Sequence, residues 1–185
     1  NVNTITKTMI VAVALTMLAP NLAMAESMQI DSALQVYEKD SRGKVRVKEL
    51  VVHLGDDGNL VLHRQDRFRA ITYLLRPSAV SELETLFAKG ADWAATAKEK
   101  KVDIQKEIGS IRYNQNNNLT VSFVSMEEGS VHYIILDIEM LYQTATFFLE
   151  PAVPGEIMKR INKAPQVKAE LDAAIAAKNQ KDQLF

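Results

Sequence analysis

The chain of 185 residues contains no cysteine. This absence excludes disulfide bridges, thiolate metal sites and cysteine nucleophiles, so side-chain packing has to stabilise the fold. Glycine is scarce as well, with seven residues scattered singly, which leaves no glycine-rich loop to hold a nucleotide phosphate. Neither a Gly-x-Ser-x-Gly nucleophile motif nor a His-Glu-x-x-His zinc motif occurs. We therefore expect no cofactor and assign no catalytic residue.

An overall excess of positive charge is also lacking. The chain has 22 Lys and Arg residues against 23 Asp and Glu residues, a formal net charge of −1. Proteins that bind nucleic acid through its phosphates usually carry a strong positive field, which this chain does not have. We therefore expect no nucleic-acid partner.

The first 25 residues have the pattern of a secretory signal peptide. Lys7 supplies a positive charge, an apolar run follows from Met9 to Leu18, and Ala23-Met24-Ala25 provides a small-x-small cleavage site. The apolar run is shorter than the roughly 20 residues that cross a bilayer. We expect cleavage after this site, with no transmembrane span afterwards. A retained membrane anchor is the alternative. The leader favours a periplasmic destination, and an extracellular one stays open.

Two segments of the chain resemble each other. Residues 71–90 read ITYLLRPSAVSELETLFAKG, and residues 145–164 read ATFFLEPAVPGEIMKRINKA. Each segment reads as a strand that ends before a proline and is followed by a helix, because proline cannot continue a ladder but can open a helix. Alternating apolar residues predict three further strands before each junction. Chance similarity between two strand-to-helix junctions is the alternative to a true repeat.

The pattern as a whole predicts an α+β domain built from two tandem four-strand-plus-helix repeats. Such a unit cannot bury its sheet alone, so we expect two antiparallel sheets, one packed against the other. The expected boundaries are 1–25 for the signal peptide, 26–105 for the first half and 106–185 for the second half with a C-terminal helix.

The first half contains a hairpin whose register can be predicted. A three-residue turn with Gly58 in the left-handed conformation would pair Gly55 with Asn59. Residues 44–54 alternate, but their phase slips, which predicts a β-bulge near Lys48-Glu49. With this register the apolar side chains of the hairpin share one buried face: Leu50, Val52, Leu54, Leu60 and Leu62.

Three helical stretches are predicted besides the short one at Pro154 to Asn162. The first runs from Ser78 to Lys89 and is expected to stop at Gly90, with a second stretch from Ala91 to about residue 101 continuing at an angle. The last runs from Pro165 to Lys178 and carries an apolar stripe.

His53 and His63 fall on the outward face of the predicted hairpin, across its turn. Two imidazoles placed in this way could begin a metal site, but zinc requires three or four ligands. No carboxylate in the hairpin has a matching spacing, so two solvated histidines without metal are favoured. Asp137 and Glu139 share one face of a later strand, and we interpret that face as solvent-exposed.

Charge is unevenly distributed along the chain. Residues 42–76 contain eight Lys or Arg against four acids, whereas residues 108–150 contain one Arg against five acids. Lys and Arg also alternate along one strand face, so their fields add. The candidate ligand-binding or partner-binding residues are Arg42, Lys44, Arg46, Lys48, Arg67 and Arg69. Strand faces that differ in charge without any partner are the alternative.

These observations favour an exported binding or protein-interaction module rather than an enzyme. The expected partner is an unknown protein or an anionic component of the cell envelope, and complementary patches also make a homodimer possible. One alternative is a metal-dependent hydrolase that uses His53, His63 and a distant carboxylate. Another is a structural subunit that docks through the helix at Pro165 to Lys178.

Overall fold

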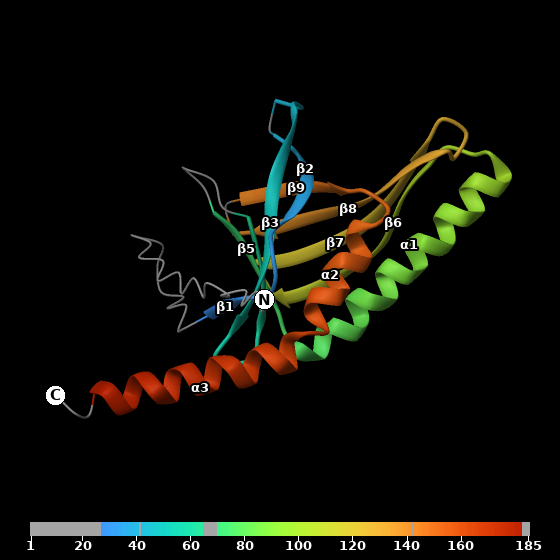
Figure 1. Cartoon of the computed structure of the whole chain (residues 1–185). Helices are drawn as coiled ribbons and strands as arrows, with labels where there is room; N and C mark the ends of the chain where they lie inside the picture. Colours follow the sequence, from blue (N-terminus) through green and yellow to red (C-terminus); the bar gives the residue numbers. More distant parts are fainter. Residues whose placement is uncertain (1–26, 41, 65–69, 142, 183–185) are drawn as a thin grey trace, which may run out of the picture.

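A computed structural model describes residues 27–40, 42–64, 70–141 and 143–182 (Figure 1). The expected signal peptide and two of the candidate binding residues, Arg67 and Arg69, lie outside these ranges. Cleavage of the leader therefore stays a prediction.

The described part contains nine strands, three α-helices and one 3₁₀ turn. The strands are β1 (Ser27–Gln29), β2 (Leu34–Lys39), β3 (Val45–Gly55), β4 (Leu60–Arg64), β5 (Ile71–Leu75), β6 (Ile104–Asn114), β7 (Asn117–Met126), β8 (Val131–Met140) and β9 (Gln143–Leu149). The helices are α1 (Val80–Lys100), α2 (Val153–Ile161) and α3 (Ala164–Asp182), and the 3₁₀ turn spans Pro77–Ala79. This composition confirms an α+β fold.

All the strands belong to one curled antiparallel sheet. The strand order is β5-β4-β3-β2-β9-β8-β7-β6. The short strand β1 lies outside this order and pairs with the end of β3 that β2 does not cover. The expectation of two separate sheets was therefore wrong. The first half joins the second through the β2–β9 ladder, in which Tyr37 pairs with Phe148. This pairing joins residues more than a hundred positions apart, so no local pattern in the sequence predicts it.

Leaving β1 aside, the element order along the chain is four strands followed by a helix, twice. Each of the two similar segments lies where predicted, at the junction of a strand with the helical segment after it. Tyr73 and Phe147 occupy the same position in the two segments, and both are buried. Whether the two halves superimpose as repeats stays a prediction.

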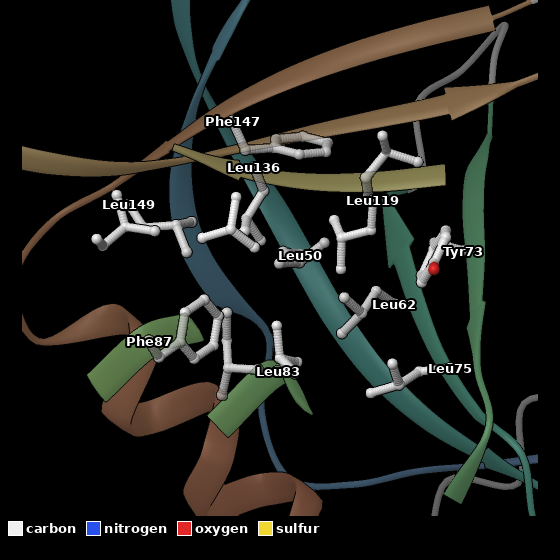
Figure 2. Packing of buried hydrophobic residues seen from close by; sticks show 14 of the residues in the cluster. Leu50, Leu62, Tyr73, Leu75, Leu83, Phe87, Leu119, Leu136, Phe147 and Leu149 are labelled. Atoms are coloured by element: carbon white, nitrogen blue, oxygen red, sulfur yellow. The ribbon is translucent and has the colours of Figure 1, made fainter. Parts of the chain in front are cut away.

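The hydrophobic core lies between the curled sheet and the helices α1 and α2 (Figures 1 and 2). Helix α1 contacts β6, β7 and β8, and α2 contacts β2, β3 and α1. In Figure 2, Leu83 and Phe87 of α1 lie among side chains from both halves of the sheet, including Leu50 and Leu136. One core therefore serves the whole described chain.

Helix α1 runs without interruption through Gly90, so the predicted helix stop at this glycine was wrong. A Cβ atom at Gly90 would lie 2.3 Å from Cδ1 of Ile134 and 3.2 Å from Cδ1 of Ile108. The glycine therefore allows the helix to approach the sheet closely. The helix ends instead at Lys101, which has a φ of +51° and donates its backbone N–H to Ala97.

The β3–β4 hairpin has the predicted turn. Gly55 donates its N–H to the carbonyl of Asn59 at 2.9 Å, and Gly58 has a φ of +79°. Val52 pairs with Leu62 and Leu54 pairs with Leu60, and all five predicted core residues of the hairpin are buried.

The predicted bulge in β3 near Lys48-Glu49 is absent. The register with β2 is regular from Leu50 to Val45, so β3 continues straight through this point. The irregularity lies instead in the segment that pairs with β3. There, residues 30–33 separate β1 from β2, and Asp31 has a φ of +65°.

Helix α3 extends beyond the strands in Figure 1 and contacts β1 and β3. Its Leu171 is buried, as the predicted apolar stripe implies. Among the described helices, none is long and apolar enough to cross a membrane.

Candidate functional site

The four described residues of the predicted basic set lie on the β2–β3 hairpin, which projects from the top of the molecule in Figure 1. Arg42, Lys44 and Arg46 are exposed, and Lys48 is partly buried closer to the body. Because β3 alternates, Lys44, Arg46 and Lys48 share one face, which continues the face of buried Leu50. We call Arg42, Lys44 and Arg46 the basic hairpin face.

Asp40 organises the turn of this hairpin. Its Oδ1 accepts hydrogen bonds of 2.9 Å from the backbone N–H groups of Arg42 and Lys44, and Gly43 has a φ of +79°. The hydrogen bond from the Lys44 backbone is the main cause that lowers the pKa of Asp40 below its ordinary value. The carboxylate also lies 3.6 Å from the guanidinium of Arg46. The carboxylate therefore stays ionised and offsets part of the local positive charge.

A second carboxylate lies among the basic residues of the first half. Glu38 Oε1 accepts a 2.8 Å hydrogen bond from Arg64, and the two side chains are only 12 % and 7 % exposed. This ion pair removes Arg64 from the positive surface. Glu38 and Asp40 precede residue 42 in the chain, so the charge count over residues 42–76 missed both and overstated the positive field.

The other face of the hairpin is apolar. Val45 and Val47 are 51 % and 56 % exposed. A bulge near Lys48-Glu49 would have turned both valines to the buried side, and the regular register with β2 shows that this bulge is absent. Instead, the hairpin extends beyond the core, and its valines lie on the side opposite the basic hairpin face.

His53 and His63 lie together, as the register predicted. Their ring centroids are 5.8 Å apart with the planes nearly perpendicular, and Nδ1 of His63 is 3.0 Å from Oγ1 of Thr72. Burial lowers the pKa of both imidazoles, with smaller contributions from His63 on His53 and from Arg64 on His63. Both rings are partly buried rather than fully solvated. Among the described residues, no group of three or more His, Asp or Glu side chains is placed to hold a metal ion.

Asp137 and Glu139 share the outer face of β8, as expected from their spacing. Asp137 accepts a 2.5 Å hydrogen bond from the hydroxyl of Thr146, and Glu139 is exposed. Glu139 borders a shallow hollow of about 360 Å³ with a polar lining that includes Arg112 and Asn118. The hollow lies at the end of the β6–β7 and β8–β9 hairpins. It was not predicted, because its walls come from turns separated in the sequence.

The chain matches no protein-family model and no curated protein. Among solved structures it is similar to an SsgA-like sporulation-specific cell division protein from Thermobifida fusca. The TM-score is 0.43 at 9 % sequence identity, and the alignment covers 84 % of this chain and 98 % of that chain. A likeness at this level carries no functional argument.

Proposed function

We propose that this protein is an exported, periplasmic binding module that binds an anionic partner through the basic hairpin face. The observation that carries the proposal is the position of Arg42, Lys44 and Arg46. They are exposed on a hairpin that projects from the body, whereas Arg64 is buried and paired with Glu38. Projection leaves the three cations accessible to a large partner.

The geometry favours a partner with repeated negative charge. Lys44 and Arg46 are two residues apart on one strand face, a separation of about 7 Å. Each exposed cation contributes roughly 1 kcal/mol near an anionic surface, and Asp40 weakens the contribution of Arg46. The binding is therefore expected to be weak and to fall steeply with salt.

The proposal also includes the leader at residues 1–25 as the export signal and the tandem relation of the two halves. The leader is supported by its charged, apolar and small-x-small segments. The repeat is supported by the recurring element order and by the two similar junction segments. Mass spectrometry of the exported protein tests the cleavage site, and backbone superposition of the two halves tests the repeat.

The binding proposal is tested with the double variant Lys44→Glu and Arg46→Glu. Wild-type protein immobilised on resin should retain an anionic component from envelope extract, and the free protein should bind heparin as a polyanion probe. We expect the double variant to lose both. The matched control is Lys98→Glu with Lys100→Glu on α1, which makes the same charge change on another exposed surface. Equal binding by the two double variants would contradict the proposal.

A further inference from the structure

A row of apolar side chains crosses the outer face of the sheet. In the ladder register, Val47 of β3 pairs with Tyr37 of β2, Tyr37 pairs with Phe148 of β9, and Phe148 pairs with Ile135 of β8. Directly paired residues point to the same side of a sheet, so the four side chains form one continuous line. We call these four residues the apolar row.

The apolar row lies on the side of the sheet opposite the core. Its strand neighbours Val36, Leu136 and Phe147 are buried in the core with α1 and α2, and alternation places the row on the other side. Val47 is 56 % exposed, and Tyr37 and Phe148 are only partly buried. An outward sheet face usually carries polar side chains, so a continuous apolar line on it indicates an interface.

Tyr133 extends this surface beside the apolar row. Its ring meets that of Phe148 edge to face, with centroids 6.2 Å apart. Ile135, which lies two residues further along the same strand, is only 6 % exposed although it faces outward. The aromatic side chains therefore form an ordered surface around an aliphatic centre, rather than isolated exposed residues.

Charged groups flank the apolar row in a self-complementary way. On one side, Lys39 pairs with Thr146 in the ladder, and Thr146 pairs with Asp137. On the other side, Glu49 pairs with Gln35.

Glu150 lies on the same side as Glu49. Glu150 accepts a hydrogen bond from the hydroxyl of Tyr37, which is the main cause that raises the pKa of that phenol and places the carboxylate beside the apolar row. One flank of the row therefore carries Lys39 and, two strands away, Asp137, whereas the other flank carries two carboxylates, Glu49 and Glu150.

We propose that a second copy of this chain packs on the outer face, related by a two-fold axis that runs along the apolar row. A half-turn about that line places each residue of the row opposite its own copy. It also brings Lys39 of each protomer between Glu49 and Glu150 of its partner, and Asp137 opposite the hydroxyl of Tyr133. Charge complementarity thus selects a second copy, because a two-fold interface must be complementary to itself.

The size of the surface limits the strength of the dimer. Stable interfaces usually bury about 800 Å² on each partner, whereas four strands and three rows of side chains span only about 14 by 13 Å. The dimer is therefore expected to be weak and reversible. Packing through the outer face leaves the basic hairpin face of each protomer accessible, so this inference does not depend on the proposed function.

Sedimentation velocity of the full chain over a range of concentrations tests the inference. The wild type should shift from monomer to dimer. Val47→Asp, Lys39→Glu and Glu49→Lys should each raise the dissociation constant at least tenfold. The combined Lys39→Glu and Glu49→Lys variant should recover part of the loss, because these two charges exchange places across the interface while Glu150 keeps its charge.

The matched control is Lys44→Glu with Arg46→Glu, on the opposite face of the same hairpin, which should leave the dissociation constant within twofold of the wild type. A protein that remains monomeric at all concentrations would overturn the inference. A dimer that tolerates Val47→Asp and Lys39→Glu would overturn it as well.

Crosslinking provides a second, independent readout, because the chain has no native cysteine. Facing sheets lie about 10 Å apart, which exceeds the Cα separation of a disulfide, so a short bismaleimide is the appropriate reagent. Val47→Cys lies on the axis and should crosslink to its own copy. Val45→Cys, equally exposed but one row off the axis, should crosslink at least fivefold less. Equal yields from the two variants would overturn the two-fold geometry.

Discussion

The hydroxyl of Tyr73 donates a 2.8 Å hydrogen bond to the backbone carbonyl of Ile111. Tyr73 belongs to β5 and Ile111 to β6, which are the first and last strands in the sheet order. The bond therefore joins the two ends of the curled sheet without a backbone ladder between them. Nearby, the guanidinium of Arg76 donates to the carbonyl of Tyr113 and lies 4.7 Å from the centre of its ring. Side chains thus hold the curl of the sheet at this point.

Tyr73→Phe should lower the free energy of unfolding by about 1–2 kcal/mol, because it leaves the buried Ile111 carbonyl without its donor. The urea midpoint at an unchanged slope measures the effect. Tyr113→Phe is the control, since it keeps the ring under Arg76 and should cost less than about 0.5 kcal/mol. Equal midpoints for the two variants would show that the hydroxyl does not secure the curl.

Tyr73 also makes stability depend on alkaline pH. Burial raises its pKa to about 12. In the unfolded chain a tyrosine ionises near pH 10, so its contribution is complete below about pH 10 and is lost as the pH rises towards 12. The loss amounts to at most about 3 kcal/mol. Unfolding free energies measured across this window should fall more steeply for the wild type than for Tyr73→Phe, and parallel curves would contradict the assignment.

The close approach of α1 to the sheet predicts a coupling between Gly90 and Ile134. Gly90→Ala in the wild type should cost about 1 kcal/mol, because the new Cβ meets Cδ1 of Ile134. Ile134→Val removes that atom, and in this background the same substitution should cost nothing or stabilise, since alanine is the better helix former by about 1 kcal/mol. A double-mutant cycle in urea measures the coupling. Additive effects would contradict the close-contact explanation for this glycine.

Gly129 and Gly58 form a matched pair that separates backbone strain from steric clash. Their φ values are +77° and +79°, but a Cβ at Gly129 would lie 2.3 Å from the carbonyl oxygen of Ala97, whereas one at Gly58 would meet nothing within 4 Å. Gly58→Ala should cost about 1 kcal/mol for its left-handed conformation. Gly129→Ala should cost at least about 3 kcal/mol, because backbone atoms must also move. Thermal midpoints compare them, and equal losses would contradict the clash.

Arg160 secures α2 to the segment between β1 and β2. Its Nε donates to the carbonyl of Ser32 at 3.1 Å, its Nη1 donates to Glu156 at 2.9 Å, and the residue is only 6 % exposed. Arg160→Met should cost about 2 kcal/mol in unfolding free energy, since the Ser32 carbonyl and the Glu156 carboxylate lose a charged donor. Lys159→Met, on the exposed side of the same helix, should cost less than about 0.5 kcal/mol. Similar urea midpoints for the two variants would exclude this role for the arginine.

Local features of the fold were predictable, because their causes lie within a few residues. The Gly58 turn sets the register of β3 with β4, and this register correctly placed Leu62 in the core. The helix stop at Gly90 failed for a complementary reason. A glycine can end a helix, and it can also allow a helix to pack closely on a sheet. Only the contacts of Gly90 with Ile108 and Ile134 show that the second explanation applies here.

The candidate site was predictable to a similar extent. Alternation along β3 correctly predicted that Lys44 and Arg46 share one strand face, and their role in binding stays a prediction. The pairing of Arg64 with Glu38 was not predictable, because these residues are 26 positions apart and meet only when the sheet curls. The exposure of Val47 was missed for the same reason: whether a strand face is covered depends on elements elsewhere in the chain.

By itself, the amino-acid sequence determined the class of fold, the strand-to-helix junctions and the sign of the charge on each strand face, because propensity, alternation and turn chemistry act over short distances. Only the tertiary structure decided that the two halves share one sheet through β2 and β9, which carbonyl each buried donor reaches, and which charges are neutralised. Those outcomes depend on contacts between distant segments, where packing geometry selects one arrangement among many that the local pattern allows.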